Sequence, residues 1–341
     1  MASLLINVGI IILTTGAIWV GSGWLESAAE KLSGYYGLPK VVQGSIVTAV
    51  GSSFPELATV VFSALFANSL ELGVGAIVGS AIFNILVIPA LSGVATEDDI
   101  EANRALVYKE AQFYMLAVSV LVITFSMAII YYPVGGEGNL SGDLTRPLAI
   151  IPLALYGLYL FIQYQDTADH ETDPEAGADI NLRRQWGFLL AGLVVILIAV
   201  ERLVHSVDVI GTAFGVPGFV MGVTIAAAAT SLPDALVSVR AARDGRGVTS
   251  VANVLGSNTF DLLVAIPLGV LIIGQTPINF AMAVPMFGAL TLATVLLFTV
   301  LRTGLALSTT ESYLLLASYF LFITWVVVET VSNAVDILPN G

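Results

Sequence analysis

The chain has 341 residues, of which 57% are hydrophobic and only 11% are charged. This composition excludes a soluble globular domain and indicates a protein that crosses a lipid bilayer several times. The net charge of −13 argues against a nucleic-acid partner, and the absence of cysteine excludes disulfides and thiolate metal sites.

Ten apolar segments follow one another along the chain, each near the roughly 20 residues that a membrane-spanning helix requires. The predicted fold is therefore an all-α polytopic membrane protein with ten transmembrane helices. We place these helices approximately at residues 4–30, 39–67, 72–92, 108–132, 146–164, 186–212, 216–242, 249–273, 279–301 and 311–333. The first segment lacks a basic leader and a clear cleavage site, so we expect a retained helix and not a signal peptide.

Basic residues mark one side of the predicted bundle. The loops after even-numbered spans hold only Arg146. The loops after odd-numbered spans hold ten basic residues: Lys31, Lys40, Arg104, Lys109, Arg183, Arg184, Arg240, Arg243, Arg246 and Arg302. This asymmetry predicts that the odd-numbered loops are cytoplasmic and that both termini lie outside the cytoplasm, in what we expect to be the cell membrane.

Three charged residues, Glu26, Glu30 and Lys31, fall near the end of the first predicted helix. We expect their side chains to reach the lipid headgroups, because long charged side chains extend toward water from a helix end. Glu329, near the end of the last helix, is expected to do the same.

The second span contains the polar stretch Gly51-Ser52-Ser53-Phe54-Pro55-Glu56. A carboxylate at membrane depth is costly, so Glu56 marks a functional site. Pro55 has no N–H and its ring clashes with the carbonyl of Gly51, so the helix should break or kink there. Carbonyl oxygens freed in this way are tolerated only where they line a cavity. Together with the serine hydroxyls and the carboxylate, they would form a site for a hard cation.

The third span carries Gly79, Ser80 and, one helical turn later, Asn84. Residues four apart share a face of a helix, so the Ser80 hydroxyl and the Asn84 amide should point the same way. Gly79 should allow another helix to approach closely, as should Gly256 in the eighth span. Taken alone, a Gly-Ser pair in a membrane helix indicates packing more often than ion binding.

An acidic stretch, in which six carboxylates occur between Asp166 and Asp179, separates the fifth and sixth spans. It is too short to fold as a domain. A solvated flexible linker is the simpler interpretation, and regulatory Ca²⁺ binding is the alternative. The predicted division is an N-terminal five-helix repeat (1–165), a cytoplasmic linker (166–185) and a C-terminal five-helix repeat (186–341).

The same polar pattern returns in the seventh and eighth spans. Ala229-Thr230-Ser231-Leu232-Pro233-Asp234 repeats the first stretch, and Gly256-Ser257-Asn258-Thr259-Phe260-Asp261 repeats Gly79-Ser80-Ala81-Ile82-Phe83-Asn84. Pro55 and Pro233 lie 178 residues apart, with five spans between the copies. Because five is odd, the second copy enters the membrane in the opposite direction, which predicts an inverted-topology repeat. Packing does not explain why both halves carry the same two polar stretches, so we expect an ion site.

At these residues the chain resembles the cation/Ca²⁺ exchanger superfamily, and within it the sodium/calcium exchangers, most closely their potassium-dependent branch. The resemblance is strongest over residues 38–91 and 216–270. It implies a transporter with no enzymatic activity and no cofactor. The chain departs from the family pattern in two respects. Gly51-Ser52-Ser53 and Ala229-Thr230-Ser231 stand where many members have Gly-Thr-Ser, and Asp234 is one methylene shorter than the usual glutamate.

The resemblance also implies roles for individual residues. Glu56 and Asp234 would hold Ca²⁺, aided by backbone carbonyls near Ser52 and Thr230. The Na⁺ sites would be completed by Ser53, Ser80, Asn84, Ser231, Ser257 and Asp261. The potassium-dependent branch has an aspartate at the position of Asp261, so K⁺ is expected beside Ca²⁺. The alternative is that Asp261 is protonated while Ca²⁺ is bound.

The predicted function is secondary antiport, in which Na⁺ moving down its gradient drives Ca²⁺ the other way by alternating access. A Ca²⁺/H⁺ exchanger is the first alternative, because buried carboxylates can carry protons, although the serines suit Na⁺ better. An intramembrane aspartyl protease would use Asp234 and Asp261 as a proton-sharing pair, but neither lies in a Gly-x-Gly-Asp context. A passive channel would need no inverted halves. The first and sixth helices are the candidate sliding elements.

Overall fold

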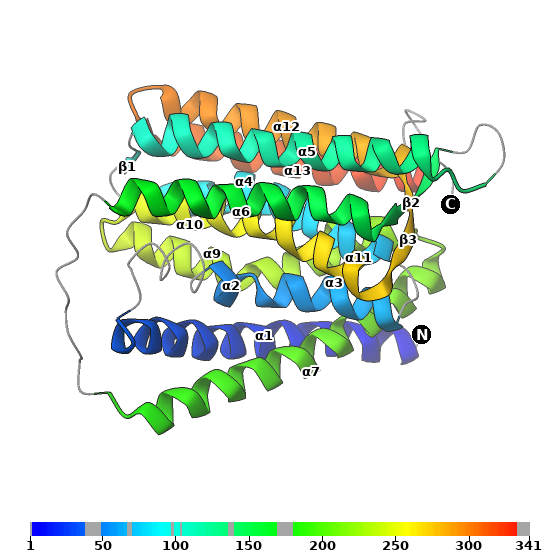
Figure 1. Ribbon diagram of the computed structural model, residues 1–341, viewed down its shortest axis with the longest axis horizontal. Coiled ribbons are helices and arrows are strands. Elements are labelled where there is room, and N and C mark those ends of the chain that lie inside the picture. The colour runs from blue at the N-terminus through cyan, green and yellow to red at the C-terminus, as the bar shows by residue number, and fades with distance from the viewer. Residues whose placement is uncertain are drawn as a thin grey trace.

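Long helices lie side by side along the long axis of the protein in a computed structural model (Figure 1). The structure describes residues 2–37, 49–66, 70–96, 99–102, 104–135, 140–168 and 180–332. Most of these residues are helical, as the sequence predicted.

The first half of the chain contains the helices α1 (Ala2–Tyr35), α2 (Ala49–Ser52), α3 (Phe54–Phe66), α4 (Leu70–Val94), the π-helix η2 (Ala105–Glu110), α5 (Ala111–Tyr131) and α6 (Arg146–Ala168). The second half contains α7 (Leu182–Phe214), α8 (Gly218–Met221), the π-helix η3 (Gly222–Ala226), α9 (Ala227–Arg243), α10 (Gly247–Phe260), the π-helix η4 (Asp261–Ala265), α11 (Ile266–Ile273), α12 (Phe280–Arg302) and α13 (Thr309–Ser332). Four short strands complete the described elements: β1 (Ile100–Glu101), β2 (Ser141–Thr145), β3 (Gln275–Asn279) and β4 (Ala306–Leu307).

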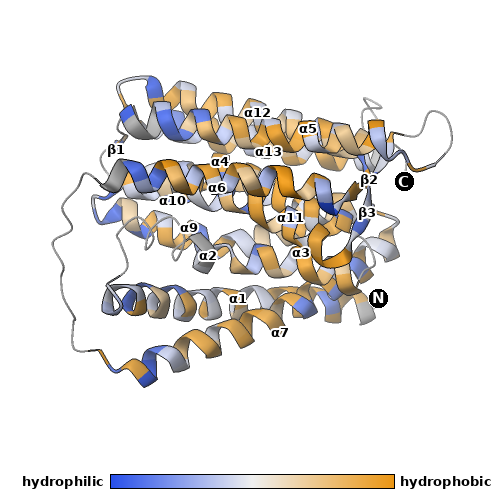
Figure 2. Ribbon diagram, in the orientation of Figure 1, coloured by the Kyte–Doolittle hydropathy of each residue, from blue (hydrophilic) through white to orange (hydrophobic). Residues whose placement is uncertain are grey.

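Nine helical segments in the described part of the chain are long and apolar enough to cross a membrane. The remaining predicted span corresponds to the shorter apolar helix α3, and its beginning, residues 39–48, lies outside the described residues. Hydrophobic residues occupy the bodies of the helices, and hydrophilic residues gather toward their ends (Figure 2). Most of the predicted acidic linker, residues 169–179, also lies outside the described residues, so the division into domains stays a prediction.

Successive spans alternate in direction, and the beginning of α1 and the end of α13 lie at the same end of the bundle (Figure 1). Helix α1 runs away from this end, whereas α7, its counterpart in the second half, runs toward it. Two turns support the repeat, because Gly37 after α1 and Gly215 after α7 both adopt left-handed φ angles, of 63° and 66°. They are separated by 178 residues, the same interval as Pro55 and Pro233. The two halves therefore have opposite orientations, as predicted.

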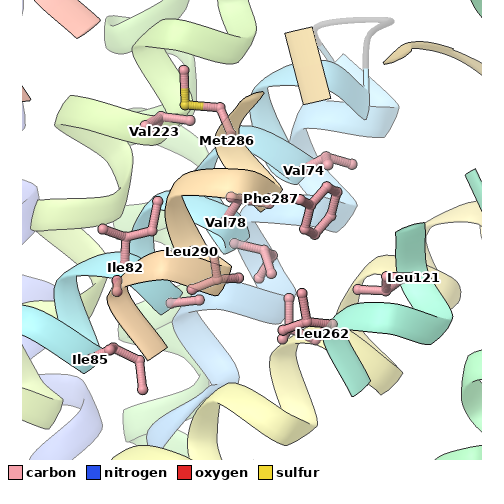
Figure 3. Packing of buried hydrophobic residues seen from close by; sticks show 14 of the residues in the cluster. Val74, Val78, Ile82, Ile85, Leu121, Val223, Leu262, Met286, Phe287 and Leu290 are labelled. Atoms are coloured by element: carbon pink, nitrogen blue, oxygen red, sulfur yellow. The ribbon is translucent and has the colours of Figure 1, made fainter. Parts of the chain in front are cut away.

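Helix α4 lies at the centre of the packing and is almost entirely buried. Its side chains from Val74 to Ile85 belong to one buried cluster with Phe287 and Leu290 of α12 (Figure 3). Helices α6 and α13, in contrast, leave much of their apolar surface exposed, as lipid-facing helices do. The ion-site motif of the third span thus lies in the most enclosed helix of the protein.

Close backbone approaches join α4 to the second half. A Cβ atom at Gly79 would meet the carbonyl oxygen of Val223, and one at Gly222 would meet the carbonyl oxygen of Leu72. The prediction of a close approach at Gly79 is therefore confirmed. The same prediction for Gly256 is wrong, because no atom outside its own helix lies within 4 Å of the position of its Cβ.

Helices α1 and α7 pack mainly against each other at one side of the molecule (Figure 1). They approach closely where a Cβ at Gly192 would lie 2.7 Å from the carbonyl oxygen of Gly21 and 2.9 Å from the backbone nitrogen of Leu25. Only 22% of the most apolar stretch of α1 is buried. This pair therefore forms a peripheral unit beside the central helices.

Two small antiparallel sheets were not predicted. β1 pairs with β4 at one end of the bundle, and β2 pairs with β3 at the end that holds the termini (Figure 1). Each sheet joins a loop of the first half to a loop of the second half. The repeat relates β1 to β3 and β2 to β4, so the two sheets are equivalent. These strands are only two to five residues long, and each pairs with a strand in a loop far away in the sequence. The local pattern of apolar residues therefore does not reveal them.

Candidate cation site

The predicted site residues come together where the α2–α3 break, α4, α9 and the α10–η4 junction meet. Each of them has an exposed fraction of 3% or less: Ser52, Ser53, Glu56, Ser80, Asn84, Thr230, Ser231, Asp234, Ser257 and Asp261. Such a concentration of buried polar groups in an apolar bundle requires compensating interactions.

The first polar stretch lies where the second span is broken. Helix α2 ends at Ser52 and α3 begins at Phe54, so Ser53 stands between the two helices. The carbonyl oxygen of Ser53 accepts a hydrogen bond of 3.0 Å from the backbone N–H of Leu57. Pro55 occupies the first turn of α3, where its missing N–H does no harm. The predicted interruption is confirmed here.

The second polar stretch has no helix end at its proline. Pro233 lies inside the continuous helix α9, and the irregular backbone lies upstream, in the π-helix η3. The prediction of matching helix interruptions in both halves is therefore wrong for this copy. Another π-helix, η4, begins at Asp261. Single π turns are frequent at functional sites because they reposition side chains without ending the helix.

Two serine pairs connect the halves across the site. The Oγ atoms of Ser53 and Ser257 lie 2.7 Å apart, and those of Ser80 and Ser231 lie 2.6 Å apart. The repeat relates Ser53 to Ser231 and Ser80 to Ser257, so it exchanges one pair for the other. Both distances are typical of hydrogen bonds between hydroxyls. The four serines predicted to bind Na⁺ are thus brought together in symmetric pairs.

Asp234 accepts hydrogen bonds through one of its carboxylate oxygens. Its Oδ2 atom accepts a hydrogen bond of 2.8 Å from the Ser257 hydroxyl and a longer one of 3.5 Å from the Asn84 amide. The Asn84 amide also donates to Asn258 Oδ1 at 2.9 Å. These contacts fix one carboxylate oxygen of Asp234 and leave the other, Oδ1, without a donor from the described residues.

Asn258 is a site residue that the sequence reasoning missed. It is fully buried, and its Nδ2 atom donates to the carbonyl oxygen of Ala81 at 3.1 Å and to the hydroxyl of Tyr114 at 3.2 Å. The signal was present, because Asn258 is an amide at membrane depth directly after Ser257. Tyr114 gave no comparable signal, since aromatic residues are common in apolar spans.

Several site oxygens are buried without a hydrogen-bond donor from the described residues. They are both carboxylate oxygens of Glu56, both of Asp261, Asp234 Oδ1 and Asn84 Oδ1. The three carboxylates belong to one polar cluster, because Ser257 donates to Asp234 and pairs with Ser53, Glu56 lies three residues after Ser53, and Asp261 lies one helical turn after Ser257. The ion pairs found among the described residues, Glu201–Arg202 and Asp244–Arg246, do not involve them. Concentrated negative charge in a desolvated site is strongly unfavourable unless a cation compensates it.

Acidic side chains alone do not form a metal cage here. Within the described ranges, no three Asp, Glu, His or Cys side chains converge tightly enough to hold a metal ion. A cation would therefore need hydroxyl, amide and backbone carbonyl oxygens as well. Ca²⁺ fits this donor set because it takes roughly six to eight oxygen ligands in flexible geometry. The donors do not suit softer metals, which prefer sulfur or imidazole.

Two carboxylates expected at the lipid headgroups lie inside the protein. Glu329 of α13 is fully buried, and Glu26 of α1 is half-buried beside Gly51. Glu30 and Lys31 are exposed, as predicted. A position near a helix end does not reveal which face of the helix meets its neighbours, and this is why the prediction was wrong for Glu26 and Glu329.

Comparison with known proteins places this geometry in context. The family model described as "Sodium/calcium exchanger protein" matches residues 6–165 and 184–328. An uncharacterized membrane protein of Methanocaldococcus jannaschii is 25% identical over 281 residues, covering 82% of this chain and 87% of that protein. Inner membrane protein YrbG of Escherichia coli is 27% identical over 282 residues, or 80% of each chain. Sodium/potassium/calcium exchanger 4 of Mus musculus is 46% identical over only 64 residues, or 10% of its length.

A solved structure of the sodium-calcium exchanger NCX_Mj is also similar. It superposes with a TM-score of 0.62 at 23% sequence identity, covering 94% of this chain and 99% of that one. At this level of identity, the likeness establishes a common fold.

Proposed function

The chain belongs to the sodium/calcium exchanger family, and from this premise we propose that its buried polar site binds Na⁺ and Ca²⁺ in turn. The protein is an integral membrane antiporter, and its transported substrates are inorganic cations. One observation carries the assignment of the site: carboxylate oxygens of Glu56, Asp234 and Asp261 are buried without donors from the described residues, between two serine pairs.

Ca²⁺ would be held chiefly by Glu56 and Asp234. The Asp234 Oδ1 atom and both Glu56 oxygens are available as ligands, and two carboxylates neutralise a divalent ion. Backbone carbonyls near Ser52 and Thr230 would add further oxygens. Flexible coordination by carboxylates and carbonyls is what Ca²⁺ prefers, and the shorter Asp234 is tolerated because such geometry adjusts.

Na⁺ would use the serine hydroxyls together with the same carboxylates. Ser53 and Ser257 already lie within hydrogen-bond distance of each other, as do Ser80 and Ser231, so each pair offers two adjacent oxygens. Because Na⁺ and Ca²⁺ would share Glu56 and Asp234, the two ions would compete. Competition for shared ligands gives exchange if the site crosses the membrane only when it is occupied.

Alternating access would come from movement of the α1–α7 unit past the central helices. This pair packs mainly against itself, whereas α4 is enclosed on all sides. The movement would open the site to one side of the membrane at a time, as in other transporters built from inverted repeats.

We further propose that K⁺ binds beside Ca²⁺ at Asp261. Ca²⁺ neutralises two of the three buried negative charges, and the third remains costly unless a monovalent cation or a proton accompanies it. Both carboxylate oxygens of Asp261 lack donors from the described residues and are available to K⁺.

Two other functions are less well supported. A Ca²⁺/H⁺ exchanger would use the carboxylates but has no need of the paired serine hydroxyls. An intramembrane protease would need Asp234 and Asp261 to act as a proton-sharing pair, yet Asp234 is engaged by Ser257 and Asn84 instead.

Ca²⁺ flux into proteoliposomes tests the proposal. Uptake should follow an imposed outward Na⁺ gradient and ignore a proton gradient of equal size. Glu56→Gln should lower the rate roughly tenfold or more, since a charged ligand contributes about 1.5–3 kcal/mol. Uptake that follows the proton gradient and ignores Na⁺ would favour the Ca²⁺/H⁺ exchanger. Wild-type-like rates in Glu56→Gln would remove Glu56 from the site.

A further inference from the structure

Helix α1 carries a carboxylate that the roles described above leave without a function. Glu26 is half-buried, although the sequence placed it among residues expected to reach the headgroups. A Cβ at Gly51 would lie 3.7 Å from the Cα of Glu26, so the α1 backbone touches the α2 backbone at this level. Gly51 directly precedes Ser52, where the helix break of the site begins. Glu26 therefore lies on the part of α1 that meets α2 at Gly51, one residue before the helix break of the site begins.

Two further observations connect the Glu26 face of α1 with the cation site. Two residues beyond Gly51, the hydroxyl of Ser53 pairs with that of Ser257, which donates to Asp234, so the α2 backbone beside Glu26 leads directly into the site. Ser22 precedes Glu26 by one helical turn and lies on the same face of α1. Its hydroxyl is buried and has no hydrogen-bond partner among the described residues. This face of α1 thus carries two side chains with oxygen atoms, one of them buried and without a partner among the described residues.

The repeat makes Glu26 distinctive. It lies 11 residues before Gly37, and the residue 11 positions before Gly215 is Val204, a buried aliphatic side chain. The first half therefore has a carboxylate where the second half has none. Glu30, one turn further along α1, has an acidic counterpart in Asp208, and both are exposed. The two halves therefore differ in charge at the position of Glu26 and Val204, but not at the exposed position of Glu30 and Asp208.

We propose that Glu26 is an additional cation-binding residue, which receives Ca²⁺ at the basic-loop side of the protein and delivers it to Asp234 and Glu56. The inference rests on the proposed exchange of Na⁺ and Ca²⁺ at the central site. Glu26 belongs to the second half of α1 (Ala2–Tyr35) and Val204 to the second half of α7 (Leu182–Phe214). Because the two helices run in opposite directions (Figure 1), Glu26 lies nearer the basic loops and Val204 nearer the opposite end. A cation arriving from the basic-loop side would exchange part of its hydration shell for the Glu26 carboxylate before it reaches the buried oxygens.

The test uses Na⁺-driven Ca²⁺ flux with the full-length protein in sealed vesicles of both orientations. Glu26→Gln should raise the half-saturating Ca²⁺ concentration on the basic-loop side by roughly three- to tenfold, because a unit charge within several ångströms of the path is lost. The half-saturating concentration on the terminus side should not change. Glu26→Asp should keep most of the wild-type affinity, and Glu30→Gln, one turn away, is the matched control and should behave like the wild type.

Three results would overturn the proposal. They are an unchanged affinity in Glu26→Gln, an equal loss on both sides, and an equal loss in Glu26→Asp, since the last two indicate a structural role. Failure of the wild-type protein to exchange Na⁺ for Ca²⁺ would instead refute the proposed function itself. The two kinds of failure are therefore distinguishable in the same assay.

Discussion

Asn84 and Asp261 occupy equivalent positions in the two halves, yet they differ in charge. The Asn84 amide donates to Asn258 and, more weakly, to Asp234. A carboxylate at that position would lack these hydrogens and would repel Asp234. Both oxygens of Asp261 lack donors from the described residues, so its charged form needs a bound cation to be stable in this desolvated site. The two halves thus share a fold but differ in charge at the centre of the site, where one has Asn84 and the other has Asp261.

This difference leads to a prediction for K⁺. We expect Na⁺-driven Ca²⁺ flux to fall when K⁺ is replaced by a large organic cation at zero membrane potential. The reason is that the Asp261 charge is then uncompensated in a desolvated site. Asp261→Asn should remove the dependence on K⁺ while it retains exchange. Equal wild-type rates with and without K⁺ would contradict the proposal and leave protonation of Asp261 as the better explanation.

Glycine decides how closely the elements of the two halves can approach. Helix α4 meets η3 backbone to backbone at Gly79, and this contact places Ser80 against Ser231 at 2.6 Å. The equivalent glycine, Gly256, faces open space. The repeat is therefore symmetric in sequence at this position but not in packing.

A matched pair of substitutions checks this difference. Gly79→Ala should destabilise the protein by about 1–3 kcal/mol, because the added methyl overlaps the Val223 backbone. Gly256→Ala should be neutral or stabilising by up to about 1 kcal/mol, because alanine favours helix and the space is free. Thermal unfolding of the purified variants in detergent measures both. Equal losses of stability would show that the two glycines have the same role.

Helix positions and most site residues could be predicted because their signals are local. An apolar run of about 20 residues predicts a span wherever it occurs, and a polar residue such as Glu56 inside one stands out through its desolvation cost. The β1–β4 and β2–β3 pairings could not be predicted in this way, since they depend on loops far apart in sequence. The continuity of α9 through Pro233 and the inward position of Glu26 likewise depend on packing that the sequence does not display.

At the scale of the whole molecule, the two sheets tie the halves together at both ends. β1 and β4 join the loop before α5 to the loop before α13, and β2 and β3 join the loop before α6 to the loop before α12. No described strand joins α1 or α7 to another element. The connections therefore leave the α1–α7 unit as the part of the protein that is least restrained.

The orientation of the molecule in the membrane can be tested with single cysteines, because the natural chain has none. We propose that the protein lies in the cell membrane, with its basic loops in the cytoplasm and both termini on the outer side. Asp244→Cys, between α9 and α10, should react with an impermeant maleimide only after permeabilisation. Leu140→Cys, at the terminus end, should react in intact cells. Both residues are exposed. The reverse labelling pattern would invert the proposed topology.

The contrast between Glu26 and Val204 has a thermodynamic consequence. An exchange cycle returns the protein to its starting state, so the ratio of its forward and backward turnover is fixed by the ion gradients and the membrane potential alone. A carboxylate at one mouth can change which step limits turnover and the Ca²⁺ concentration at which that mouth saturates. It cannot make transport one-way, since reversing the driving force must reverse the direction of the net flux. The difference between Glu26 and Val204 therefore sets the Ca²⁺ concentration at which each side of the protein saturates. The direction of transport is set by the ion gradients that the cell maintains.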